Sequence, residues 1–122
     1  MSQFNLVFRL KCFPCRRKCG IKLKDYVVIT GYRNAVYNIN GFVKDLPDLN
    51  TNRGAHGCGH YVNKDMKLVY LVTGGWVGDY VSTTELLIEG ASEWTFAGDL
   101  PTGRHDLKGA SVNNRIFMLG KY

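Results

Sequence analysis

Short runs of apolar and β-branched residues, separated by turn residues, recur along most of the chain. Three runs, at residues 26–30, 67–73 and 115–119, are almost continuously apolar, and each is followed directly by a glycine. No part of the chain from residue 26 onward keeps the apolar period of an amphipathic helix, so the runs predict β-strands. Because both faces of each run are apolar, we expect these strands to be covered on both sides.

Polar turn residues precede the second and third runs. Asn63-Lys64-Asp65 stands before the second run, and Asn113-Asn114 stands before the third. Asn and Asp tolerate the positive φ angles that tight hairpin turns require. Residues 57–62 and 109–112 are therefore predicted to be the strands that enter these two hairpins.

The chain also repeats itself at an interval of about fifty residues. Asp45-Leu46-Pro47 returns as Asp99-Leu100-Pro101, 54 positions later, and an arginine follows each copy, at Arg53 and Arg104. Each arginine leads into a glycine-containing strand and a hairpin turn. A period of this length with several strands per unit is typical of a β-propeller blade.

A full unit contains four predicted strands. The apolar second strand ends on Thr30-Gly31 in the first copy and on Thr73-Gly74 in the second, 43 positions later. A polar loop, a third strand at residues 84–88, a turn at 89–92 and then Trp94 follow the second copy.

This order resembles the kelch repeat, in which a buried strand ends on a glycine doublet and a Trp precedes a Leu-Pro turn. The doublet Gly74-Gly75, Trp94 and Leu100-Pro101 carry the resemblance. It implies an all-β chain: a partial kelch-type β-propeller of four-stranded antiparallel blades in an incomplete ring. Residues 45–98 would form one complete repeat, and residues 26–44 and 99–122 would form partial ones.

All three units depart from the kelch pattern at defined positions. The first has Gly31-Tyr32 in place of the glycine doublet and Phe42 in place of the Trp. The complete unit has Leu87 where a Tyr is usual, although the first unit keeps Tyr37. The third unit ends shortly after Gly120.

The marks of the repeat are expected to be structural. At Gly31, Gly74, Gly75 and Gly120 the absence of a side chain would let the chain leave an inner strand without collision. Trp94 would fill the wide part of the blade, and its removal would lower the free energy of unfolding by about 3–5 kcal/mol. Phe42 would supply the same filling in a smaller form.

The polar loop of the complete unit is the best candidate for contact with a partner. It carries Trp76, Asp79 and Tyr80, and Trp, Tyr and Arg dominate contact energies at protein interfaces. Alternatively, the two aromatic residues cover the edge of the blade. Arg53 and Arg104 belong to the same predicted rim, where they either clamp backbone carbonyl groups or project toward an acidic partner.

Composition and charge narrow the class of protein. The chain has 122 residues, and no stretch approaches the ~18 apolar residues of a membrane span. The net charge of +6 comes from residues 1–25, with seven basic residues and one acid, whereas residues 26–122 hold nine of each. We therefore expect a basic leader outside the repeats, and no nucleic-acid or membrane binding.

The four cysteines leave open the alternative of a zinc-binding site. Cys12, Cys15 and Cys19 lie in the leader, and Cys58 lies in the histidine-containing stretch 56–60. These side chains are suitable ligands for zinc, so a small zinc-binding domain through the three leader cysteines is an alternative. Because 36 residues separate Cys19 from that stretch, we expect no metal. The cysteine pattern and the lack of a secretory signal favour a reducing, cytoplasmic setting.

The kelch resemblance implies a module for protein–protein interaction, with an unknown protein as partner. Some propellers of this type are oxidases, such as galactose oxidase with its copper held by Tyr and His, so a metalloenzyme fragment is the other alternative. No nucleophile, zincin or phosphate-loop motif occurs, and we expect neither catalytic residues nor a cofactor. Two blades alone would expose apolar faces, which predicts self-association of what we expect to be a fragment.

Overall fold

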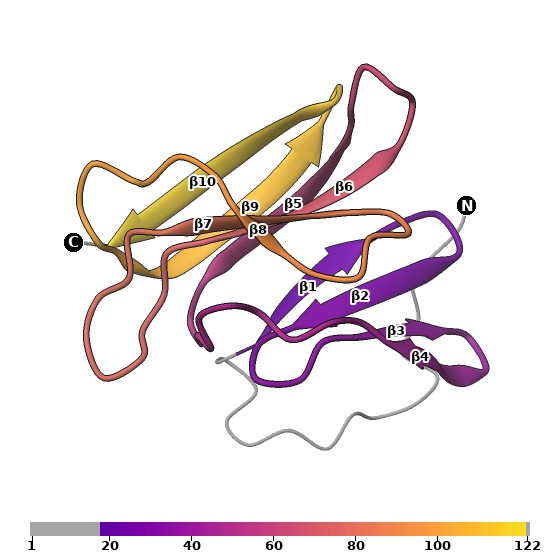
Figure 1. Cartoon of the computed structure of the whole chain (residues 1–122), viewed down its shortest axis with the longest axis horizontal. Helices are drawn as coiled ribbons and strands as arrows, with labels where there is room; N and C mark the ends of the chain where they lie inside the picture. Colours follow the sequence, from indigo (N-terminus) through magenta and orange to yellow (C-terminus); the bar gives the residue numbers. More distant parts are fainter. Residues whose placement is uncertain (1–17, 122) are drawn as a thin grey trace.

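The computed structural model describes residues 18–121, and in this part of the chain it contains ten β-strands and no helix. The strands form two four-stranded antiparallel sheets and one two-stranded hairpin, each with its strands in sequence order (Figure 1). The prediction of an all-β chain with four-stranded antiparallel sheets is confirmed. None of the residues from 18 to 121 belongs to a helix long and apolar enough to cross a membrane.

The first sheet is built from four short strands joined by tight connections. They are β1 (Cys19–Lys22), β2 (Tyr26–Thr30), β3 (Ala35–Asn38) and β4 (Gly41–Asp45). The strand predicted at residues 26–30 is β2, and it lies between β1 and β3.

Strand β1 corrects the expected boundary between the leader and the repeats. The prediction that residues up to 25 lie outside the sheets is wrong for β1, because all four of its residues pair with β2. Ile21 pairs with Val28, and both side chains are buried in the core. Residues 26–44, expected to form a partial unit, therefore belong to a complete four-stranded sheet.

The second sheet follows the predicted complete unit closely. It consists of β5 (Gly57–Val62), β6 (Leu68–Thr73), β7 (Thr84–Ile88) and β8 (Thr95–Phe96). Its first and third strands have the bounds that the sequence predicts.

The remaining hairpin consists of β9 (His105–Val112) and β10 (Arg115–Lys121). Asn113 and Asn114 form its turn with φ angles of 51° and 62°, as predicted. The prediction that the last strand stops at Gly120 is wrong, because β10 continues past it through a register shift between Leu119 and Lys121.

The hairpin packs closely against β5 because β5 is rich in glycine. A Cβ atom at Gly59 would lie 2.9 Å from both Ser111 Oγ and Ile116 Cγ2. At the far end of β5, the Asn114 side chain accepts a hydrogen bond from Val62 N at 2.7 Å and donates one to Val62 O at 3.0 Å. The side chain of one turn residue thus fixes the hairpin to the second sheet.

A core of buried side chains lies between the two four-stranded sheets. It includes Trp94, which is 2% exposed, and Leu49 from the β4–β5 connection, together with residues from both sheets: Ile21, Val28, Val36, Cys58, Tyr70, Val72 and Leu87. The Trp94 indole Nε1 donates a hydrogen bond to Pro47 O at 2.8 Å. The prediction that Trp94 fills the interior is confirmed.

Phe42 does not fill the first sheet in the same way, so that prediction is wrong. Its side chain is 53% exposed, because β4 is the outer strand of its sheet. The ring packs edge-on against Tyr37, with centroids 6.0 Å apart, and lies under the Arg33 guanidinium.

A disulfide bond joins the two sheets through their first strands. Cys19 of β1 is bonded to Cys58 of β5, across a sequence separation of 39 residues. Cys19 is therefore not available as a zinc-binding thiolate, and Cys12 and Cys15 lie outside the described residues.

The difference between Trp94 and Phe42 gives a first prediction. Trp94→Ala should lower the free energy of unfolding by about 3–5 kcal/mol, because it leaves a cavity in the core. Phe42→Ala removes a largely exposed ring and should cost less than about 1 kcal/mol. Urea unfolding followed by tryptophan or tyrosine fluorescence measures both, and equal losses would contradict the assignment of the core.

Candidate partner-contact site

The connection between β6 and β7 lies against the segments that follow the two repeated arginines. Gly54 and Trp76 exchange backbone hydrogen bonds of 3.1 and 2.8 Å. Gly75 N donates to Arg104 O at 2.7 Å, and Arg104 N donates to Val81 O at 3.3 Å. The structure thus brings the predicted loop and both arginine-containing segments together at one end of the sheets.

The glycine doublet allows this close approach. Gly74 and Gly75 have φ angles of 67° and 109°, which place the chain in a region that residues with a side chain rarely occupy. A Cβ atom at Gly75 would lie 2.6 Å from Gly54 O. The structural role predicted for the doublet is confirmed.

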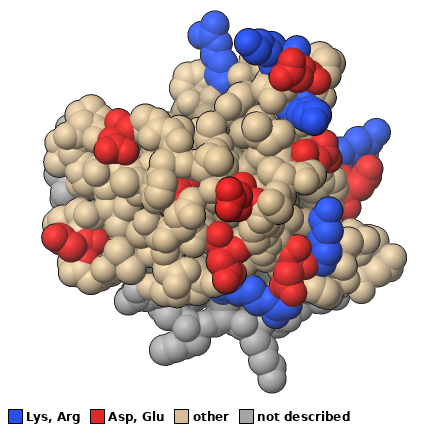
Figure 2. Space-filling model, in the orientation of Figure 1, with Lys and Arg blue, Asp and Glu red and all other residues tan. Residues whose placement is uncertain are grey.

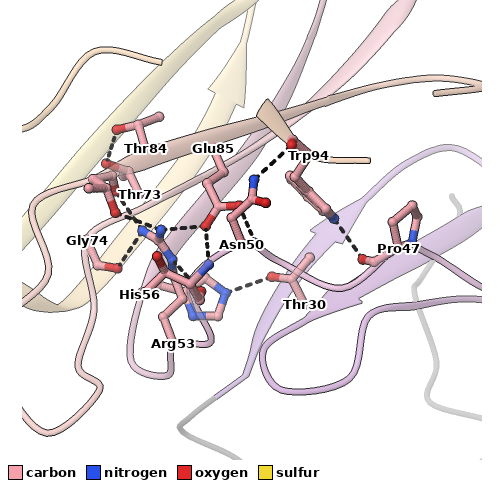
Figure 3. Close-up of polar contacts among 12 residues, drawn as sticks. Thr30, Pro47, Asn50, Arg53, His56, Thr73, Gly74, Thr84, Glu85 and Trp94 are labelled. Atoms are coloured by element: carbon pink, nitrogen blue, oxygen red, sulfur yellow. Dashed lines mark hydrogen bonds and ion pairs between the residues drawn. The ribbon is translucent and has the colours of Figure 1, made fainter. Parts of the chain in front are cut away.

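Arg53 holds the connection from inside the fold. Its side chain is fully buried, and its Nη1 donates hydrogen bonds to Gly74 O at 3.1 Å and Thr83 O at 2.6 Å (Figure 3). Its Nη2 donates to Thr83 Oγ1 at 2.8 Å and to Glu85 Oε2 at 2.7 Å. Of its two predicted roles, Arg53 therefore fulfils that of a carbonyl clamp, and it offers no surface to a partner.

Glu85 completes the clamp from β7. Its carboxylate is also fully buried and accepts hydrogen bonds from Asn50 N at 2.7 Å and Thr51 N at 3.0 Å (Figure 3). Burial lowers the pKa of Arg53, and the hydrogen bond and charge of Glu85 act in the opposite direction. A guanidinium stays protonated in proteins, so the two residues form a buried ion pair.

Three aromatic side chains gather on the outer side of this connection. The Trp76 and Tyr80 rings are edge-on, with centroids 5.1 Å apart, and the His105 ring lies 5.0 Å from Tyr80 and 6.3 Å from Trp76. Tyr80 is 49% exposed, whereas Trp76 and His105 are half-buried. We call these three residues the aromatic cluster.

The other predicted contact residues border the cluster. Asp79 is exposed, and its Oδ1 accepts a hydrogen bond from Tyr80 N at 2.7 Å, which shapes the loop. Arg104 is half-buried and directly precedes His105. Four of the five predicted residues thus lie together, and only Arg53 is withdrawn from the surface.

His105 is the member of the cluster that the sequence did not indicate. Considered alone it is one of three histidines, and its packing against Trp76 and Tyr80 depends on a contact across about 25 residues of sequence. Its position next to Arg104 was the available signal. Its Nδ1 is buried and has no hydrogen-bond partner among the described residues.

His56 occupies a different environment, at the junction of the two sheets. It is 2% exposed, and its Nε2 lies 2.7 Å from Thr30 Oγ1 (Figure 3). Burial lowers the pKa of His56 to about 3, with further contributions from the charges of Arg53 and Lys18. The imidazole is therefore neutral at physiological pH.

Among residues 18–121, no group of three or more His, Cys, Asp or Glu side chains has a geometry that could hold a metal ion. Comparison of the chain with protein-family models and with curated proteins finds no match.

The buried ion pair gives a second prediction. Arg53→Met leaves the Glu85 carboxylate buried without a counter-charge and should lower the free energy of unfolding by about 3–5 kcal/mol. Arg33→Met is the matched control, because it breaks the exposed Arg33–Asp45 pair and should leave the free energy of unfolding nearly unchanged. Chemical denaturation of both variants tests this, and a small loss for Arg53→Met would refute the clamp.

His56 gives a third prediction, on the dependence of stability on pH. Its pKa is about 3 when folded and about 6.5 when unfolded, so between these values the unfolded chain binds more protons. The free energy of unfolding should therefore fall below pH 6.5, by about 2 kcal/mol at pH 5 from this residue. Urea unfolding at pH 7 and pH 5 measures the loss.

The variant His56→Leu is the control for this effect, because a leucine side chain does not titrate. Its free energy of unfolding should depend less on pH between 7 and 5 than that of the wild type. Identical losses in the two proteins would show that another group is responsible.

Proposed function

We propose that the chain is part of a kelch-like β-propeller and serves as a protein-interaction module. The proposed contact surface is the aromatic cluster of Trp76, Tyr80 and His105, bordered by Asp79 and Arg104.

Matching backbone conformations support a repeated unit. Gly31 and Tyr32 have positive φ angles of 119° and 60°, as Gly74 and Gly75 do at the equivalent positions. Ala55 and Asp106 each follow a repeated arginine by two residues, and both have a φ angle of 53°. Positive φ is uncommon outside glycine, so its return at equivalent positions favours one backbone plan used twice.

Matching contacts support the same interpretation. Leu46 N donates to Asn34 O at 2.8 Å, and Leu100 N donates to Ser82 O at 2.7 Å. In both cases the leucine of a Leu-Pro turn bonds to the loop that precedes the third strand of its unit. The Leu-Pro turns therefore close two successive units in the same way.

The arrangement of the first strands also fits successive blades. β5 contacts both β1 and β9, the first strands of the sheets before and after it, and Figure 1 shows β5 between them. Adjacent first strands are expected where blades are arranged around a common axis.

The observation that carries the binding function is the half-exposed Tyr80 ring, fixed against Trp76 and His105. A rigid aromatic side chain loses little conformational entropy on binding and contributes a large contact area. The loop that carries it is held by the Arg53 clamp, so the cluster is presented in one conformation.

Neither alternative function gains support from the described residues. The zinc domain would need Cys19, which is bonded to Cys58. A disulfide is typical of proteins from oxidising compartments, so the Cys19–Cys58 bond favours such a compartment over the cytoplasmic setting expected from the sequence. Self-association stays a prediction, to which the 59% and 79% exposure of Phe117 and Leu119 on β10 lends support.

The proposed contact surface gives a fourth prediction. Tyr80→Ala should weaken the binding of a partner protein that the wild-type chain captures at least about tenfold, as expected for a central interface residue. Phe96→Ala is the matched control, because Phe96 is a similarly exposed ring (56%) on β8. Quantitative affinity capture with immobilised wild-type and variant chains measures both. A protein retained equally by all three would show that the aromatic cluster is not the contact surface.

A further inference from the structure

A cavity of about 530 Å³ opens between the two four-stranded sheets. It is bordered by the β1–β2 turn, by β3 and β4, and by the turn that follows β7. These two turns lie at the strand ends opposite the β6–β7 connection, as can be followed in Figure 1. The cavity is therefore separate from the aromatic cluster, and its volume is in the usual range for ligand sites.

The lining of this cavity combines apolar side chains with polar groups, including two phenols. Val36 and Leu87 form part of its lining and are buried side chains of the core. Tyr70 is only 5% exposed, and its hydroxyl lies 3.4 Å from the hydroxyl of Tyr26. Burial raises the pKa of Tyr70, so its phenol stays neutral and can accept a hydrogen bond.

The charged groups around the opening are mostly acidic. Among residues 18–121, Asp25, Asp45 and Glu89 line the cavity with a single cation, Lys44, so these four side chains carry a net charge of −2. Asp45 already pairs with Arg33 at 2.9 Å, whereas Asp25 and Glu89 have no ion pair with any of residues 18–121. Figure 2 shows acidic and basic side chains interspersed over the face of the molecule that is in view.

We propose that this cavity binds an arginine side chain of a partner protein. The guanidinium would enter the cavity first, toward the phenols of Tyr26 and Tyr70, and the carboxylates of Asp25 and Glu89 at the opening would supply the opposite charge. A guanidinium has five donors in a planar fork, which suits acceptors on different elements, here two carboxylates and the phenols of Tyr26 and Tyr70. Asp25 and Glu89, which form no ion pair with any of residues 18–121, border this cavity, and together they are complementary to a long side chain with a terminal positive charge.

This assignment does not depend on the function proposed for the aromatic cluster. The two sites lie at opposite ends of the strands, so a variant of one leaves the other intact. Failure of the arginine site would leave the Tyr80 prediction untouched, and the reverse also holds.

The test uses a small arginine probe and its neutral isostere. N-acetyl-arginine methylamide is titrated into the ¹⁵N-labelled chain, with N-acetyl-citrulline methylamide in a parallel titration. We expect a dissociation constant in the millimolar range, typical of a fragment of this size, and shifts of the amide signals of Asp25, Tyr26 and Glu89–Ala91. The citrulline probe should bind at least about tenfold more weakly, because it carries no charge.

Charge-removing variants locate the binding in the cavity. The double variant Asp25→Asn, Glu89→Gln should weaken arginine binding at least about tenfold. The control Asp65→Asn, Glu93→Gln removes two exposed carboxylates that do not line the cavity and should bind as the wild type does. The dispersion of the amide spectrum reports whether each variant is folded. Tyr26→Phe provides a second, milder variant, with an expected loss of two- to threefold, about 0.5 kcal/mol.

Three results would overturn the proposal. Equal affinity for the arginine and citrulline probes would show that charge is not recognised. Unchanged binding by the folded Asp25→Asn, Glu89→Gln variant would place the probe elsewhere. Tighter binding of N-acetyl-lysine methylamide than of the arginine probe would contradict recognition of a guanidinium.

Discussion

The buried ion pair between Arg53 and Glu85 determines how the end of the second sheet is organised. Glu85 brings a negative charge into the interior from β7, and Arg53 meets it from the segment that enters β5. The same guanidinium gathers the carbonyl groups at both ends of the β6–β7 connection. Burial of two charges is costly unless each is fully hydrogen-bonded, so the pair specifies one arrangement of these segments. The loop with Trp76 and Tyr80 depends on that arrangement.

Local pattern was sufficient to predict most strands of the second sheet. The apolar run of β6, the β-branched and leucine-rich run of β7 and the Asn113–Asn114 turn each carry their information within a few residues. The sequence left two roles open for Arg53, because an arginine can serve equally as a carbonyl clamp or as a partner contact. Its burial follows from Glu85, 32 residues away in the sequence, and no local pattern indicates that pairing.

Other features escaped prediction because they depend on non-local contacts. β1 has one buried apolar residue, Ile21, within a basic stretch, so its strand character comes from pairing with β2. Phe42 stands where the repeat expects an interior aromatic residue, but β4 is an outer strand and the Phe42 side chain is largely exposed. The cavity between the two sheets likewise combines side chains from both, which no single segment of the sequence brings together.

The disulfide between β1 and β5 has a consequence for how the chain matures. β1 is held to its sheet by four paired residues and by the burial of Ile21, and the bond to Cys58 adds a covalent constraint on that short strand. While both thiols are reduced, β1 can detach more easily and leave the backbone groups of β2 unpaired. An unpaired strand edge is a template for aggregation. The disulfide is therefore expected to keep β1 paired with β2 in a newly made chain, a role distinct from any contribution to the strength of the finished core.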